Sequence, residues 1–153
     1  MTLKDFLLQQ SRWAYEEAPE FSLLGALDAL TPAELVWCAD PELWTIGEIL
    51  YHVATAKIEY CRQGFGQWRG DCVRCVEDLP ALLELLARAQ FHLLECLASC
   101  DEETLGHPIR THYHGSSAAE FFGAMIAHDL AHAAQIRALR RRYGSRRGGF
   151  YPV

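Results

Sequence analysis

The 153-residue chain is 50% hydrophobic and 22% charged, the proportions of a folded globular protein rather than of a disordered one. Its net charge of −6 is unevenly distributed, because six arginines and no acidic residues lie from Arg137 onward. Residues 1–136 therefore carry 8 basic and 20 acidic groups, and this acidic body argues against a nucleic-acid partner. At the arginine-rich end we expect a cationic helix terminus that frays or docks on a partner subunit, with phosphate contact as the alternative.

The first residues lack a positive leader followed by an apolar core, and no run reaches the roughly 18–20 apolar residues of a membrane-spanning helix. We therefore expect a cytoplasmic protein without a membrane partner. In that compartment the cysteines should stay reduced despite their even number. They are Cys38, Cys61, Cys72, Cys75, Cys96 and Cys100.

The first half of the chain contains several helix signals. Apolar residues at helical spacing predict a helix at about residues 3–17, which Pro19 ends, and a second short helix at about residues 21–30. Thr31 and Glu34 form a predicted capping box with Pro32 at the first helical position, which begins one or two further turns.

Three longer helices are predicted after these. A capping box at Thr45 and Glu48 begins a helix at about residues 46–62, and the leucine spacing predicts another at about residues 76–100. Ser117 and Glu120 begin the last helix, which ends near Gly144. Glycines indicate a loop at residues 64–71, and residues 101–117 are polar and rich in turn formers. The expected fold is one all-α domain, an antiparallel helix bundle over residues 1–144 with a C-terminal tail at residues 145–153.

Two of these long helices carry histidines at metal-ligand spacing. His128 and His132 are four residues apart and share one helix face, and His52 lies on another long helix beside small residues and carboxylates. Helix bundles build metal sites from facing helices, and three neutral imidazoles with an open fourth position are typical of a catalytic site. The alternative is that they are ordinary core histidines.

Residues 43–54 and 126–137 resemble the DinB/YfiT-like superfamily of metalloenzymes. The resemblance rests on a tryptophan before the capped helix, one histidine on that helix, and a later His-x3-His pair with Gln135 three residues on. It covers essentially the whole chain, although Ala134 stands where relatives commonly have glycine. It implies an antiparallel four-helix bundle of the DinB/YfiT type, often a homodimer. It also implies zinc or nickel on His52, His128 and His132.

Characterised relatives include the mycothiol-dependent maleylpyruvate isomerase and bacillithiol transferases. The resemblance therefore implies a metal-dependent enzyme, a thiol-dependent S-transferase or a hydrolase, acting on a small-molecule substrate with a low-molecular-weight thiol or water. It leaves the catalytic residues open. The alternative is a non-catalytic, metal-stabilised dimeric bundle that binds a ligand or partner in a stress response.

Several polar residues near the histidines have more than one interpretation. Glu48 and Glu59 flank His52 along its helix and are candidates to orient it or to accept a proton; solvated or ion-paired carboxylates are the alternative. We expect Asp129 at the surface or an interface, and Gln135 to pack between helices.

The remaining candidates are a Cys-x2-Cys pair and a set of loop residues. Cys72 and Cys75, with His112 and His114, have some features of a zinc site or a redox pair; the default is ordinary cysteines at a junction between loop and helix. Cys96 and Cys100 share a helix face and should pack. His92 and His107 have no assigned role. Phe65, Trp68 and Tyr113 either line a pocket mouth or cover the end of the bundle.

Overall fold

The computed structural model describes residues 1–66, 70–111 and 117–145, so the predictions for Trp68, His112, Tyr113, His114 and most of the C-terminal tail lie outside the described residues. All regular secondary structure in the described part is helical. The elements are α1 (Leu3–Arg12), a π-helical turn (Trp13–Glu17), a 3₁₀ turn (Gly25–Leu27), α2 (Pro32–Val36), α3 (Ile46–Phe65), α4 (Leu79–Ser99), α5 (Glu102–Gly106) and α6 (Ala118–Tyr143).

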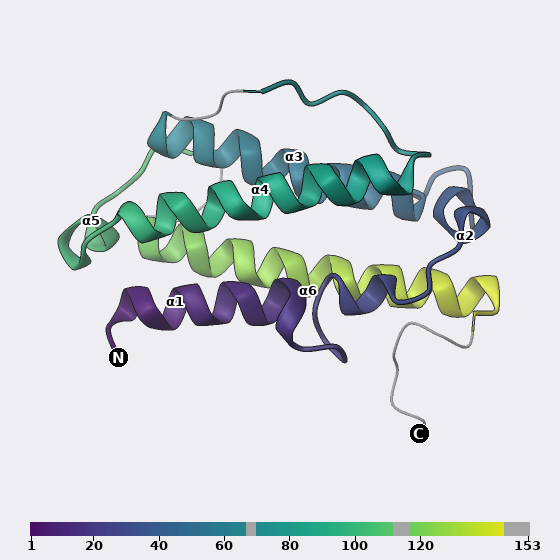
Figure 1. Ribbon diagram of the computed structural model, residues 1–153, viewed down its shortest axis with the longest axis horizontal. Helices are drawn as coiled ribbons and strands as arrows, with labels where there is room; N and C mark the ends of the chain where they lie inside the picture. Colours follow the sequence, from purple (N-terminus) through teal and green to yellow (C-terminus); the bar gives the residue numbers. More distant parts are fainter. Residues whose placement is uncertain (67–69, 112–116, 146–153) are drawn as a thin grey trace.

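Helices α1, α3, α4 and α6 lie side by side along the molecule (Figure 1). Helices α3 and α4 run in the same direction, because both begin at the end of the molecule where α2 lies (Figure 1). Gly47, near the start of α3, accordingly lies against Val76, just before α4. Helix α6 runs opposite to α3, so the late residue Phe65 on α3 stacks on the early residue Phe122 on α6. The predicted antiparallel arrangement therefore holds for α3 with α6 but not for α3 with α4.

The predicted helix starts are confirmed by their caps. The side chains of Thr31, Thr45 and Ser117 each accept a hydrogen bond from the backbone N–H three residues on, and the glutamate carboxylate at that position accepts one from the backbone N–H of the cap residue. These reciprocal bonds satisfy N–H groups that the helix itself leaves unpaired. Gly144 ends α6 with a φ of 96°, in the left-handed region that favours glycine.

The core lies between the long helices. Ile49, Leu50 and Val53 of α3 are completely buried, as their spacing predicts. Apolar residues at the other end of α3 pack with the later part of α4 and the first turns of α6. None of the helices in the described ranges is both long and apolar enough to cross a membrane.

Residues 21–30 do not form the predicted short helix. Only Gly25–Leu27 makes a 3₁₀ turn, and several neighbouring carbonyls accept hydrogen bonds from arginines of α6. Arg137 donates to Pro19, Phe21 and Ser22, and Arg140 donates to Ala26. These two arginines are buried, so the prediction of a fraying or partner-docking cationic terminus is wrong for them. The turn-rich stretch after Cys100 also contains α5, although its sequence predicts only turns there.

Candidate metal centre

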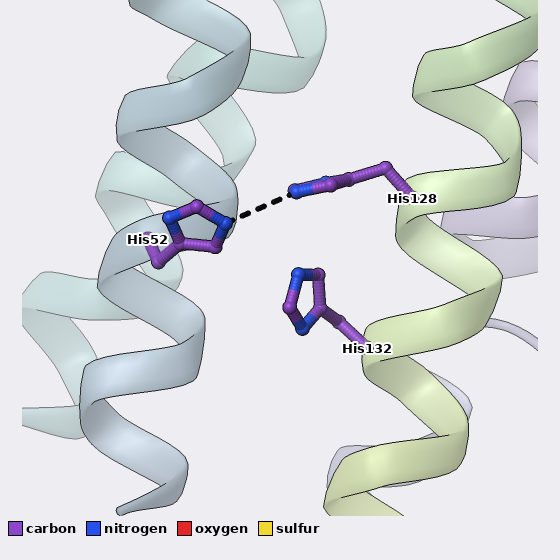
Figure 2. Close-up of side chains that lie close together, drawn as sticks. All are labelled: His52, His128 and His132. Carbon is purple, nitrogen blue, oxygen red and sulfur yellow. Dashed lines mark hydrogen bonds between the residues drawn. The ribbon is translucent and has the colours of Figure 1, made fainter. Parts of the chain in front are cut away.

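Two helices bring the three predicted histidines together. Figure 2 shows His52 on α3 facing His128 and His132 on α6, with the rings directed into the space between the helices. His128 and His132 project from the same face of α6 because they are four residues apart. The Thr45 cap sets where α3 begins, and His52 follows two turns later.

The nitrogen atoms of the three rings converge. One ring nitrogen of each histidine lies within 4.8 Å of the others, and the Nε2 atoms of His52 and His128 are 3.1 Å apart (Figure 2). An ion with metal–nitrogen bonds of about 2.0–2.1 Å in tetrahedral geometry places two ligand nitrogens about 3.3 Å apart. The His52–His128 pair therefore has nearly the spacing of two ligands on one ion, and the three histidines together could hold a divalent transition metal.

Gln135 orients one of the rings. The Nδ1–H of His132 donates to Oε1 of Gln135 over 2.9 Å, and this bond leaves Nε2 of His132 as the free electron-pair donor. We expected Gln135 to pack between helices, so its observed contact corrects that interpretation. Its position three residues after His132 was the sequence signal for this role.

The surroundings keep two of the imidazoles neutral. Burial lowers the pKa of His128 to about 3, assisted by the neighbouring His132, His52 and Lys57. Burial and His132 also lower the pKa of His52. Neutral imidazole is the form that binds metal ions, so these two rings have the required protonation state at neutral pH.

A cleft of about 250 Å³ opens beside His52. It is lined by Trp44, Glu48, Tyr51, His52, Thr55 and Arg74. The Trp44 ring lies 5.0 Å from that of His52, centroid to centroid. Arg74 reaches the cleft from the segment before α4, and its guanidinium lies 5.7 Å from the centre of the Tyr51 ring. A small molecule in this cleft would therefore meet aromatic walls, the Glu48–Arg74 ion pair and the His52 ring.

A buried ion pair lies behind the histidines. Lys57 Nζ contacts Asp129 Oδ2 at 2.6 Å and Gln90 Oε1 at 2.7 Å, so it connects α3 with both α6 and α4. Asp129 follows His128 directly but turns into the core. Our expectation that Asp129 lies at the surface or an interface is therefore wrong, because the α6 face next to His128 packs against α3 rather than facing solvent.

The part of the chain that carries the three histidines matches a known protein family. The family model of the DinB superfamily matches residues 17–136. The chain belongs to the DinB superfamily. The match includes His52, His128 and His132. No match was found among curated proteins or among solved structures.

The two candidate carboxylates of this DinB protein, Glu48 and Glu59, each form an ion pair. Glu48 completes the α3 capping box and forms an ion pair with Arg74 at 3.3 Å, so it lies at the cleft. Glu59 forms a surface ion pair with Arg62 at 2.6 Å. Both carboxylates thus follow the ion-paired alternative. No local sequence pattern predicts the contacts of Lys57 and Arg74, because their partners are distant along the chain.

The cysteine-based zinc site is not supported in the described part of the chain. There, Cys72 and Cys75 belong to no group of three metal-binding side chains, and His112 and His114 lie outside it. The Cys72 carbonyl accepts a hydrogen bond from the Tyr51 hydroxyl at 3.2 Å, which fastens this segment to α3. Cys96 and Cys100 are buried, as predicted, and Phe65 covers Phe121 and Phe122 near the end of α3.

Proposed function

We propose that this DinB protein is a metal-dependent enzyme in which His52, His128 and His132 hold a divalent ion, zinc or nickel. The observation that carries the proposal is the convergence of three imidazole nitrogens beside an open cleft. Three protein ligands leave a tetrahedral ion one position for substrate. We further propose that the long helices form a four-helix bundle of the DinB/YfiT type over residues 1–144, with residues 145–153 as a tail.

The chemistry that fits this site is S-transfer or hydrolysis. A divalent ion held by neutral ligands keeps its full charge, so it would favour the deprotonated form of a thiol or water at the open position. Trp44 and Tyr51 would pack against the apolar part of a small substrate, and Arg74 would attract an anionic group on it. In S-transfer, the sulfur bonds to an electrophilic carbon, the leaving group departs with its electron pair, and the thiol proton passes to solvent.

Turnover by metal-loaded protein tests this proposal. Zinc- or nickel-loaded protein is incubated with each of a panel of low-molecular-weight thiols and an aryl or alkyl halide, and thiol loss is followed against the metal-free protein. We expect faster loss with metal, and loss of both metal and activity in His52→Ala. The matched control is His107→Ala, which removes an exposed histidine.

One result would contradict the proposed activity, and another would contradict the metal site itself. If metal binds but thiol loss across the whole panel never exceeds that of the metal-free protein, the non-catalytic, ligand-binding bundle is favoured. If purified protein holds no stoichiometric metal and is not stabilised by added zinc or nickel, the three-histidine site itself is refuted.

The homodimer and the cytoplasmic location belong to the same proposal. Phe91 on α4 is 64% exposed, and Leu83 is exposed eight residues earlier on the same helix; residues eight apart share a helix face, and such apolar surface favours association. The six free cysteines agree with a reducing compartment. Sedimentation velocity should show a dimer that Phe91→Asp converts to a monomer. A monomeric wild-type protein at micromolar concentration would contradict the dimer.

A further inference from the structure

A second cluster of metal-binding side chains lies in the core, away from the histidine site. It consists of Cys61 on α3 with His92 and Cys96 on α4, and all three side chains are buried. Their donor atoms lie within 4.8 Å of one another. Cys61 follows His52 by nine residues, or about two and a half turns and 13.5 Å along the helix. The two clusters therefore project from opposite sides of α3.

The cluster repeats the pattern of the histidine site with softer ligands. His92 and Cys96 are four residues apart on one helix, as His128 and His132 are, and the third donor again comes from α3. His92 Nε2 and Cys96 Sγ are 3.9 Å apart. Ligand bonds of about 2.3 Å to sulfur and 2.0–2.1 Å to nitrogen place these atoms about 3.6 Å apart in a tetrahedral site. The observed His92–Cys96 separation is thus close to that of two ligands in a tetrahedral site, and the Cys61 donor atom lies within 4.8 Å of both.

The surroundings favour a bound cation over free thiolates. Leu93, Leu97, Phe121 and Met125 pack around the cluster. Free thiolates would therefore be buried in apolar surroundings, where an uncompensated charge is costly. A Zn²⁺ ion that displaced the two thiol protons would balance the charge of both thiolates, and a Cu⁺ ion would balance one of the two charges, so either ion reduces the penalty for burying them.

We propose that Cys61, His92 and Cys96 form a second metal site for a thiophilic d¹⁰ cation, Zn²⁺ or Cu⁺. Thiolate and imidazole together are ligands that suit both ions. Binding releases two protons to solvent and forms two metal–sulfur bonds and one metal–nitrogen bond. Because the donors come from both helices, the ion would fasten the parallel pair α3 and α4. This proposal uses none of the three histidines and is independent of the proposed enzyme activity.

Cobalt substitution separates the two sites spectroscopically, because thiolate ligands give Co²⁺ a charge-transfer band in the near ultraviolet and imidazole ligands do not. Reduced wild-type protein titrated with Co²⁺ under nitrogen should show this band. The band should persist in His128→Ala and disappear in Cys61→Ser and Cys96→Ala. Cys100→Ser is the matched control, since the buried Cys100 thiol donates to the Cys96 carbonyl at 3.3 Å rather than belonging to the donor set, and it should keep the band.

Direct titration then identifies the ion. Wild-type protein should bind one more equivalent of Zn²⁺ or Cu⁺ than Cys61→Ser, and competition with a chelator of known affinity distinguishes the two ions. The wild-type measurements remain decisive if a variant fails to fold. Absence of the cobalt band in wild-type protein, together with no second equivalent of either ion, would overturn the proposal. Loss of the band in Cys100→Ser but not in Cys96→Ala would also overturn it.

Discussion

The ammonium group of Lys57 lies 2.6 Å from the carboxylate of Asp129, and the two side chains are only 0% and 1% exposed. This pair connects the two helices that carry the candidate metal ligands. Asp129 adjoins His128 on α6, and Lys57 follows His52 by five residues on α3. The pair therefore holds the two helices in the register at which their histidines meet.

Removing one partner of this pair should strongly destabilise the fold. Lys57→Met leaves a buried carboxylate without its cation, and we expect the free energy of unfolding to fall by about 3–5 kcal/mol. Urea denaturation at pH 7 measures the change. Because an apolar pair of similar shape avoids the unpaired charge, the double variant Lys57→Met, Asp129→Leu should recover most of the loss.

A surface pair provides the matched control for this experiment. Glu59 and Arg62 are also 2.6 Å apart, but their side chains are about half exposed. Arg62→Ala should therefore change the free energy of unfolding by only about 0–1 kcal/mol. Equal losses for Lys57→Met and Arg62→Ala would show that burial of the Lys57 pair does not matter.

Gln135 should tune metal affinity without being a ligand. Gln135→Leu removes the acceptor that holds the His132 ring, and we expect zinc affinity to fall by about 10–100-fold with the overall fold retained. Chelator competition measures the affinity, and circular dichroism monitors the fold. Gln63→Leu, which removes an amide bonded to Glu59 within α3, is the control. Unchanged affinity in Gln135→Leu would refute the orienting role.

Gly47 permits the close approach of α3 to the segment that precedes α4. A Cβ atom built at Gly47 would lie 1.8 Å from the Val76 carbonyl oxygen, and that atom is backbone, which has little freedom to move aside. We expect Gly47→Ala to lower the free energy of unfolding by about 1–3 kcal/mol. Thermal or urea denaturation gives the value.

Gly123 on α6 is the matched control for Gly47. A Cβ atom there has no neighbour within 4 Å, so Gly123→Ala should stabilise the protein by about 0.5–1 kcal/mol through the better helix propensity of alanine. A destabilisation of the same size in both variants would mean that the close contact with Val76 is not responsible.

The buried Glu34 should make the free energy of unfolding depend on pH in the acid range. Burial raises the pKa of its carboxyl group, but hydrogen bonds from Thr31 and Arg140 outweigh burial and hold the pKa below the ordinary value of 4.5. The folded state therefore binds a proton at Glu34 less readily than the unfolded state does. The stability that this group contributes is present above pH 4.5 and is lost as the pH falls through the folded-state pKa.

The variant Glu34→Gln isolates this contribution. At pH 7 it should be less stable than wild type by about 3–5 kcal/mol, because the buried Arg140 loses its charge partner. As the pH falls below 4.5, the difference in free energy of unfolding between Glu34→Gln and wild type should become smaller. Urea denaturation from pH 7 to below pH 4.5 measures this difference. Glu84→Gln, at an exposed glutamate, is the control and should have a free energy of unfolding close to that of wild type at each pH. A difference that does not change with pH would rule out the linkage.

Local sequence signals determined most of the helices and the candidate ligands. The caps at Thr45 and Ser117 depend on residues only three positions apart, and the His128–His132 spacing places both rings on one helix face. The placement of His52 opposite that pair was predicted from the rule that helix bundles build metal sites on facing helices, and the family resemblance implied the same ligand set. The short helix at residues 21–30 was wrong because local propensity there is overridden by hydrogen bonds to Arg137, more than 100 residues away.

Only the tertiary structure decided which helices run parallel and which polar groups are buried together. Periodicity shows which residues share a helix face but not which helix packs against that face. The sequence therefore predicted Asp129 at the surface, whereas in the fold it contacts Lys57 of α3. The same holds for Cys61 and His92, which are 31 positions apart in the numbering and meet because α3 and α4 pack in the same direction. Long-range pairing depends on how the chain connects and packs, and that information is not local. The sequence by itself thus determined the helices and the ligand types, whereas packing decided the site behind the histidines and the second cluster.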